Sequence, residues 1–259
     1  MDPLLFAMPD ALEGEQRWLI SAAQALELLE QVGPTLEAIP RESGTFIRTT
    51  YLDTPRHTLA GSPGGVRARI RLREYVDTEG RLTASALELK VTTGGVRMKE
   101  RVVLDPSETR RVRAGDVSWL AVTVSEVAPG LAAWLRRLGH ELAPVAMTWY
   151  RRHALRTSDG STRLTLDEGV RLCRPAHEDA KLFPTNDLVC GTLASHVLEV
   201  KGHGPPPAAL ANALEVLGAP RDFSKYEATL AAVVRAGAHR RQAVAGGSAA
   251  RLVAAPALR

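Results

Sequence analysis

The sequence is poor in the residues that build metal centres, disulfide frameworks and membrane spans. Its 259 residues include only two cysteines, Cys173 and Cys190, which have no CxxC partner and no histidine cluster nearby. A structural metal site or a disulfide framework is therefore not expected, and this usage fits a reduced cytoplasmic setting. No stretch approaches the roughly 20 apolar residues of a membrane helix, and residues 1–15 lack the basic start of a secretory signal. We expect a soluble cytoplasmic protein without a membrane span.

Signatures of common nucleotide-binding and nucleic-acid-binding folds are also missing. Neither GxxxxGK followed by Ser or Thr nor GxGxxG occurs in the chain. The net charge is +4, and residues 236–259 contain four arginines and no acidic residue, so the remainder is close to neutral. A protein that binds a nucleic-acid duplex normally carries its excess charge as a patch on the folded body. We therefore predict no nucleic-acid partner.

Turn signals and hydrophobic periodicity divide the chain into many strands and a few helices. Capping boxes predict helices over 22–32 and from 224 to about 235, and Gly and Pro bound two more over 131–138 and 208–217. Strands dominate between these helices, which indicates an α+β fold built on an antiparallel sheet. The predicted strands span residues 46–53, 66–75, 84–91, 97–104, 121–127, 146–155, 161–170 and 196–201.

The same patterns predict a single domain over residues 13–235. Residues 1–12 form a short leader in this interpretation. Residues 236–259 are rich in Ala, Gly and Arg, and they are predicted to form a disordered basic tail. The tetrapeptide LELK at 87–90 recurs as LEVK at 198–201. This repeat fits a pseudo-symmetric barrel in which equivalent strands supply equivalent groups.

Charged residues alternate with apolar residues along several predicted strands. Because side chains point alternately to the two faces of a strand, Arg67, Arg69, Arg71 and Arg73 share one face. Guanidinium groups about 7 Å apart along a strand repel one another unless an anion lies among them. The other charged residues that share a face with a charged neighbour are Glu13, Glu15, Arg17, Glu88, Lys90, Arg97, Lys99, Arg101, Arg163, Asp167, Glu199 and Lys201.

Two arrangements fit this alternation. In the ordinary one, the sheet buries its apolar face and exposes its charged face to water. In the other, the sheet closes into a barrel with the charged face inward, which makes a polar tunnel and packs the apolar face on helices. The dominance of arginine over five or six strands favours the tunnel. Such a bore suits an elongated polyphosphate, because arginine pairs with phosphate oxygens and carboxylates can hold a divalent cation.

Lys225 points to an anion near one helix end. The capping box of Ser224 puts this lysine at the first helical position, where the helix dipole is already positive. A lysine there is unfavourable by roughly a few tenths of a kcal/mol unless an anion binds at that end. The alternative is a lysine that faces solvent at little cost.

Eight short motifs follow one another along the chain: YLDT at 51–54, IRLREY at 70–75, LELK at 87–90, KER at 99–101, WYRR at 149–152, RLTLD at 163–167, LEVK at 198–201 and FSKY at 223–226. In order and spacing they resemble the VTC domain. This domain is the catalytic module of the vacuolar transporter chaperone complex, within the triphosphate tunnel (CYTH-like) superfamily. The resemblance covers about residues 13–235.

The resemblance implies a closed antiparallel eight-stranded β-barrel with flanking helices. It also implies a polyphosphate polymerase that transfers the γ-phosphate of ATP to a growing polyphosphate chain, with Mn²⁺ or Mg²⁺ as cofactor. The expected ligands are therefore ATP and polyphosphate or triphosphate. Fungal members of the family carry a regulatory domain and membrane helices in addition, so an unidentified membrane or regulatory partner is also considered.

Matching the motifs residue by residue implies roles for individual side chains. Glu199 is expected to be the leading metal ligand, and Glu88 is either a second ligand or a salt-bridge partner of Lys90. The expected catalytic residues are Arg71, Arg73, Lys99, Arg152 and Glu199. The expected phosphate-binding residues are Arg69, Arg71, Arg73, Lys90, Lys99, Arg101, Arg152, Arg163, Lys201 and Lys225.

Three positions near these motifs stay open. Glu13 and Glu15 resemble the ExExK opening of the superfamily, but Arg17 stands where lysine is usual, so the role of the first strand is undecided. Arg67 and Arg69 either extend the bore or face solvent near its mouth. Asp53 is expected to cap a turn rather than to bind metal.

Two other functions remain compatible with the sequence. A tunnel hydrolase would cleave inorganic triphosphate or nucleoside triphosphates in the same bore. A non-catalytic module would bind polyphosphate without any metal-dependent turnover. The products formed from ATP distinguish the three functions.

Overall fold

The computed structural model describes residues 14–40, 42–60, 66–94, 96–176 and 183–251. The proposed leader and Glu13 lie outside the described residues. Ten strands form one sheet in which every neighbouring pair is antiparallel. They are β1 (Glu15–Ile20), β2 (Glu37–Ala38), β3 (Thr45–Asp53), β4 (Arg67–Val76), β5 (Leu82–Thr93), β6 (Val96–Val103), β7 (Ala143–Arg156), β8 (Thr162–Cys173), β9 (Val189–Thr192) and β10 (His196–Gly202).

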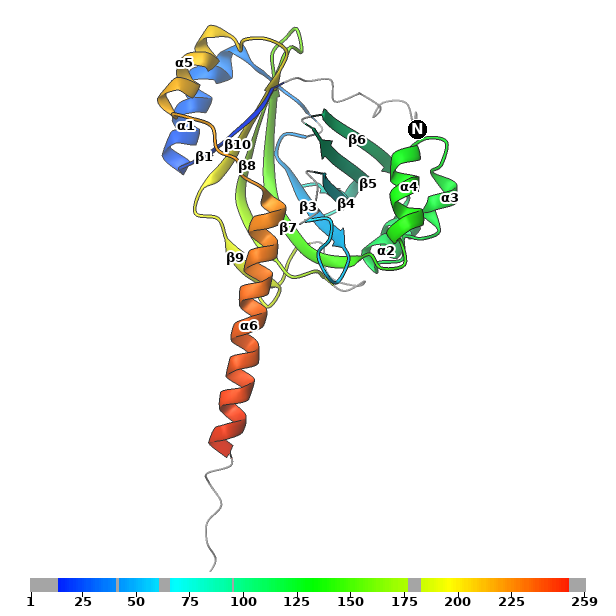
Figure 1. Ribbon diagram of the computed structural model, residues 1–259. Coiled ribbons are helices and arrows are strands. Elements are labelled where there is room, and N and C mark those ends of the chain that lie inside the picture. Colours follow the sequence, from blue (N-terminus) through cyan, green and yellow to red (C-terminus); the bar gives the residue numbers. More distant parts are fainter. Residues whose placement is uncertain (1–13, 41, 61–65, 95, 177–182, 252–259) are drawn as a thin grey trace, which may run out of the picture.

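The sheet is curled into an open half-barrel, not the closed barrel that the sequence predicts (Figure 1). Its main path runs β1-β10-β8-β7-β3-β4-β5-β6, while β2 pairs with β7 and β9 pairs with β8. Among the described residues, β1 and β6 are the two ends of this path. Side chains connect the two ends instead, because Glu15 on β1 contacts Lys90 on β5 and Arg97 on β6. Alternation along a strand fixes which face is polar, but it does not decide whether two edges pair.

Helices cover the convex, apolar face of the sheet in two groups (Figure 1). Leu52, Ile70, Leu87 and Leu89 of β3–β5 pack under one group, and Trp18, Leu164 and Leu198 of β1, β8 and β10 pack under the other. The first group is α2 (Pro106–Arg113), α3 (Leu120–Thr123) and α4 (Pro129–Leu138). The second group is α1 (Ala22–Val32), followed by the 3-10 turn η2 (Gly33–Thr35), and α5 (Ala208–Val216). The apolar residues of the alternating strands therefore face the helices, as the tunnel arrangement requires.

Helix α6 (Lys225–Arg251) packs on the other side of the sheet. Ala228 and Ala232 on α6 join Ile47, Tyr150 and Val197 in an apolar cluster on the concave face. The helix then projects away from the half-barrel (Figure 1). It ends at Arg251, so much of the segment that was predicted to be a disordered tail is helical, as alanine-rich sequence favours. Residues 252–259 lie outside the described residues, and no described helix is long and apolar enough to cross a membrane.

One predicted strand, over residues 121–127, is wrong. Most of α3 and the turns after it occupy this segment, and the buried apolar residues here are Leu120, just before the segment, Ala121 and Val124. That spacing places them on one side of a helix, whereas the β-branched Val122 is 80% exposed. Helix α2 was not predicted, although Asp105 and Glu108 form a complete capping box at its start.

Candidate active site

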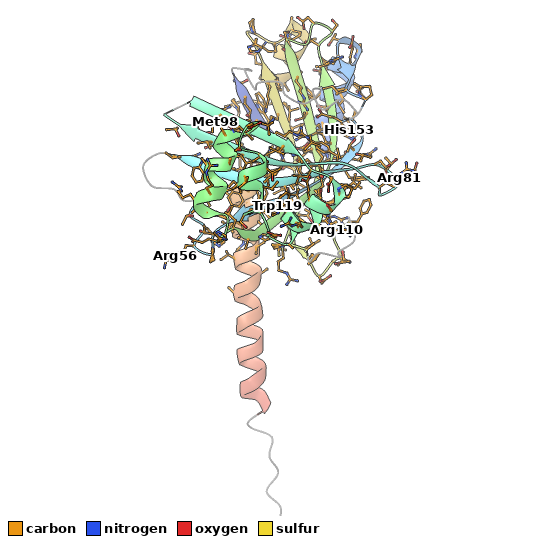
Figure 2. All side chains as sticks on the ribbon, turned by 90° about the vertical axis from the view of Figure 1, so that its right-hand side faces the viewer. Arg56, Arg81, Met98, Arg110, Trp119 and His153 are labelled. Atoms are coloured by element: carbon orange, nitrogen blue, oxygen red, sulfur yellow. The ribbon has the colours of Figure 1, made fainter. Side chains whose placement is uncertain are left out.

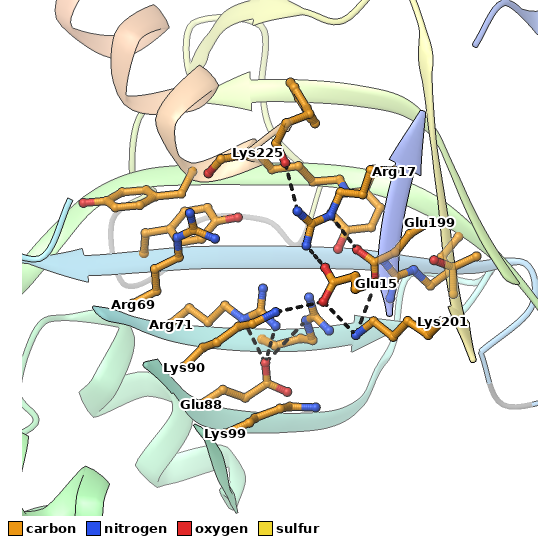
Figure 3. A pocket seen from close by; sticks show the side chains of 18 of the residues that line it. Glu15, Arg17, Arg69, Arg71, Glu88, Lys90, Lys99, Glu199, Lys201 and Lys225 are labelled. Atoms are coloured by element: carbon orange, nitrogen blue, oxygen red, sulfur yellow. Dashed lines mark hydrogen bonds and ion pairs between the residues drawn. The ribbon is translucent and has the colours of Figure 1, made fainter. Parts of the chain in front are cut away.

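A polar cavity lies on the concave side of the half-barrel (Figure 3). Its empty volume, which includes open solvent at the mouth, is about 1050 Å³. Strands from both halves of the sheet and the start of α6 contribute its walls. The basic side chains that line it are Arg17, Arg69, Arg71, Arg73, Lys90, Lys99, Arg101, Arg152, Arg163, Lys201 and Lys225. The carboxylates that line it are Glu15, Glu42, Glu88 and Glu199.

All twelve side chains selected from the sequence therefore meet around one cavity. They come from strands on both sides of the curled sheet and from the first turn of α6. The two LE(L/V)K segments lie in β5 and β10, each next to an end of the strand path, so Glu88 and Glu199 reach the cavity from the two ends of the sheet. Arg67 does not line this cavity, whereas Arg69 does.

The cavity carries a large positive excess. Eleven basic side chains against four carboxylates leave seven positive charges if every group is ionised. Burial, reinforced by the nearby charges of Lys201 and Arg71, lowers the pKa of Lys90 to about 7. Arg73 Nε and Thr165 Oγ1 are buried without a hydrogen-bond partner among the described residues. Crowded cations and unsatisfied polar atoms are both relieved by an anionic ligand.

Glu88 is the centre of a cluster of arginines. It accepts a hydrogen bond of 2.8 Å from Arg71 Nε, and Arg101 Nε and Arg73 Nε lie 3.7 and 4.0 Å from its carboxylate oxygens. Burial alone would raise the pKa of Glu88, but the surrounding positive charges hold it well below its usual range. Of the two roles considered for Glu88, the salt bridge to Lys90 is not formed, because Lys90 reaches across to Glu15 and Glu88 pairs with arginines.

Glu15 and Glu199 form a second carboxylate cluster with Arg17 and Lys201 (Figure 3). Arg17 Nε donates to Glu199 at 2.9 Å and also contacts Glu15. Lys201 Nζ lies 3.6 Å from Glu15 and 3.3 Å from Glu199, so it links the two carboxylates. Burial would raise the pKa of Glu199, but Lys201 and Arg17 hold it well below the usual range. Arg17, which stands where the resemblance led us to expect lysine, therefore lines the cavity.

Asp167 holds two of the basic side chains, Arg152 and Lys225, in place. It accepts two hydrogen bonds from Arg152, of 2.6 and 2.8 Å, and Lys225 Nζ lies 2.7 Å from the same carboxylate. Asp167 is fully buried, and burial would raise its pKa, but Arg152 and Lys225 lower it. The anion that the sequence predicts near Lys225 is therefore Asp167 within the protein itself, and a bound phosphate would be an additional partner.

The first turn of α6 is attached to the sheet beside this cluster. Tyr226 donates a 2.5 Å hydrogen bond to Asp53, and its ring stacks on Tyr51 with centroids 4.7 Å apart. Asp53 also accepts hydrogen bonds from the backbone N–H groups of Thr54, Leu59 and Ala60, so it caps a turn as predicted. The FSKY motif thus has two roles, because Tyr226 attaches α6 to the sheet and this attachment positions Lys225.

The carboxylates of the cavity could hold a metal ion only with ligands from outside the described residues. Among the described residues, no group of three or more His, Cys, Asp or Glu could hold a metal ion alone. Mg²⁺, however, is usually held by one or two carboxylates together with substrate phosphates. Lys201 contacts both Glu15 and Glu199, so these two carboxylates are neighbours, whereas Glu88 is surrounded by arginines.

Sequence reasoning missed several residues of the cavity. Glu42 contacts Arg163 across the cavity wall, but it lies in the connection before β3, where no strand periodicity could identify it. Tyr75 and Tyr150 are aromatic wall residues. The partnership of Asp53 with Tyr226 joins residues that are 173 positions apart, and no short-range pattern signals such a contact.

The chain was compared with curated proteins and with solved structures. The comparison with curated proteins gives no match. Among solved structures, the PH1819 protein from Pyrococcus horikoshii OT3 is 14% identical with a TM-score of 0.45, over 83% of this chain and 97% of that chain. A "putative adenylate cyclase" from Bacillus halodurans is 12% identical with a TM-score of 0.48, over 82% and 94%. Another from Vibrio parahaemolyticus is 14% identical with a TM-score of 0.44, over 85% and 98%.

A family match covers most of the sequence. The VTC domain matches residues 13–234, which include every strand that the structure describes and the beginning of α6, up to residue 234. The eight motifs that resemble this domain all lie within the matched segment. The chain belongs to the VTC domain family.

Proposed function

We propose that this protein is a metal-dependent polyphosphate polymerase that transfers the γ-phosphate of ATP to a growing polyphosphate chain. The supporting observation is the charge of the cavity, which is lined by eleven basic side chains and only four carboxylates. Phosphoryl transfer depends mainly on alignment of the reacting oxygens and on neutralisation of charge, so no covalent protein nucleophile is needed.

The proposed roles follow from how each side chain is held. Arg152 is fixed by two hydrogen bonds to Asp167, so its guanidinium group is oriented before substrate arrives. Arg71 and Arg73 lie beside Glu88, and the lysine at position 99 lies on the adjacent strand β6. We assign phosphate binding to these residues together with Arg69, Lys90, Arg101, Arg163, Lys201 and Lys225.

Glu199 and Glu15 are the proposed carboxylates for Mn²⁺ or Mg²⁺. A bound cation would supply charge neutralisation between the phosphates. Glu199 would then have to exchange part of its contact with Arg17 and Lys201 for the cation. The family resemblance suggested Glu88 as a second ligand, and its three arginine neighbours favour a different role, which is to orient the arginines that grip phosphate.

The decisive experiment is a product analysis. Purified protein is incubated with ATP and Mn²⁺ or Mg²⁺, and the nucleotide and phosphate products are separated by size. ADP together with a long-chain polyphosphate is expected. Orthophosphate as the sole phosphate product would assign a hydrolase instead, and binding of polyphosphate without turnover would assign a non-catalytic module.

Matched variants connect the products to the cavity. Arg73→Gln removes a cavity arginine whose side chain is 11% exposed. It should lower turnover by roughly hundredfold, the usual effect of losing one charge-stabilising group. Arg81→Gln is the control, because Arg81 lies in the exposed β4–β5 hairpin, outside the cavity (Figure 2). If both variants are as active as the parent protein, the cavity is not the site of the reaction.

A further inference from the structure

A second basic hollow adjoins the cavity at its mouth. It is lined by Arg17, Arg67, Arg69, Lys90, Thr92, Arg97 and Asp222, and we name it the mouth subsite. Arg17, Arg69 and Lys90 line both the mouth subsite and the cavity, so the two share a wall. Arg67 and Arg97 are the basic side chains that line the mouth subsite and not the cavity among the described residues. Neither belongs to the eight motifs that resemble the family.

The strand register shows how the mouth subsite continues the row of cations. Arg71 pairs with Glu88, Arg69 pairs with Lys90 one step outward, and Arg67 pairs with Thr92 a further step outward. On the next strand, Arg97 pairs with Thr92. Residues that share a face of a strand are about 7 Å apart, so the row from Arg73 to Arg67 extends over about 20 Å.

The positive charge of the mouth subsite is weakly compensated. Arg67 lies 3.9 Å from Asp222, but their side chains are 65% and 87% exposed, and pairs of this kind contribute little. Arg97 lies 3.4 Å from Glu15, which also contacts Arg17, Lys90 and Lys201. Arg69 lies 3.2 Å from the half-exposed Glu227. Five basic side chains line the hollow against one carboxylate.

These features favour a flexible polyanion as the ligand. Exposed arginines keep their rotational freedom and can follow a chain that has no fixed shape, and little desolvation is needed to bind it. Proteins that bind single-stranded nucleic acid combine such cations with aromatic rings on which bases stack. No aromatic residue lines the mouth subsite among the described residues. A polyphosphate chain, which has charge but no bases, matches this composition better.

We propose that the mouth subsite binds the part of a polyphosphate chain that extends beyond the cavity, and that it makes the protein prefer long chains over triphosphate. This inference rests on the proposed function. A triphosphate group fits among the cations of the cavity alone, whereas a longer chain also reaches Arg67 and Arg97. Chain-length preference is therefore set at these two arginines, separately from the residues that act on the reacting phosphates.

The test compares two ligands without metal or nucleotide, so that no turnover takes place. Binding of tripolyphosphate and of a long polyphosphate of defined length is measured by calorimetry for the parent protein, for Arg67→Gln with Arg97→Gln, and for a control. The control is Arg81→Gln with Arg110→Gln, the same change at two exposed arginines that line neither hollow (Figure 2). Melting curves check that all three proteins are folded.

The mouth variant should bind the long chain at least about tenfold more weakly and tripolyphosphate within about threefold of the parent, while the control matches the parent for both. Its salt dependence should also weaken by about 1–2 units in the slope of log K against log salt, by analogy with the loss of two phosphate contacts on a single strand. Equal loss for both ligands, or no loss for the long chain, overturns the inference.

The same measurements separate this inference from the proposed function. If the parent protein binds neither ligand, the proposed function fails, and the inference fails with it. If the parent binds both ligands and the mouth variant behaves like the parent, only the inference fails. A single-stranded oligonucleotide that binds as tightly as polyphosphate and is equally weakened in the mouth variant would show that the subsite takes nucleic acid.

Discussion

Replacing Glu199 with glutamine removes one negative charge from the cavity and keeps the size of the side chain. The charged neighbours of Glu199 hold its pKa well below the usual range, so the parent carboxylate is ionised at neutral pH. Its partners Arg17 and Lys201 both retain contacts with Glu15. Glu199→Gln is therefore expected to fold, and its effects should report on charge.

The electrostatic effect on metal-free binding can be estimated. Two unit charges about 7 Å apart interact by roughly 2 kcal/mol at an effective dielectric constant of about 20. The open side of the cavity reduces this value. We expect Glu199→Gln to bind tripolyphosphate more tightly by about 1–2 kcal/mol, or about five- to thirtyfold, because a repulsive carboxylate is lost. Metal-dependent turnover of ATP should fall by roughly hundredfold or more.

These opposite effects distinguish a functional carboxylate from a structural salt bridge. Calorimetry with tripolyphosphate in the presence of a chelator gives the first effect, and the ATP product analysis gives the second. Glu168→Gln is the matched control, because Glu168 contacts His153 and Arg151 and does not line the cavity. Turnover within threefold of the parent, or weaker metal-free binding in Glu199→Gln, would refute the reasoning.

Two further predictions concern stability. Tyr226→Phe removes a hydrogen bond to the buried carboxylate of Asp53. The free energy of unfolding, measured by urea denaturation, should therefore fall by about 2 kcal/mol. An unchanged value would mean that Asp53 does not hold α6. Lys90 has its pKa lowered from 10.5 to about 7 in the folded protein, so between these pH values the unfolded chain binds more protons at this residue. The ionisation of Lys90 should therefore make the free energy of unfolding rise as the pH increases from about 7 to 10.5. Urea midpoints measured against pH should rise less steeply in Lys90→Met, and parallel curves would contradict the lowered pKa.

The polar lining of the cavity was predictable because strand geometry is local. A period of two along 66–75 already assigns Arg69, Arg71 and Arg73 to one face and Ile70 and Leu72 to the other. The structure places the arginines in the cavity and the apolar residues under the helices. The same logic failed for 121–127, where β-branched residues suggested a strand but packing on α4 favours a short helix.

Pairing across the cavity was not predictable. One of the two roles considered for Glu88 was a salt bridge to Lys90 on its own strand, but curling of the sheet brings Glu15 to Lys90 and leaves Glu88 to the arginines. Coulomb energy depends on the distance between charges in space, which the spacing of residues along the chain does not give.

The sequence by itself determined the strand faces, the capped helices and the set of charged residues that share one surface, because these depend on contacts between residues close in the chain. Only the tertiary structure decided that the sheet stays open between β1 and β6, that Asp167 is the anion beside Lys225, and that Arg67 and Arg97 form a separate mouth. The first and third depend on how strongly the sheet curls, and the second depends on where α6 packs against the sheet. Curvature is a sum over all the strands and their packed helices, so no single segment of sequence specifies it.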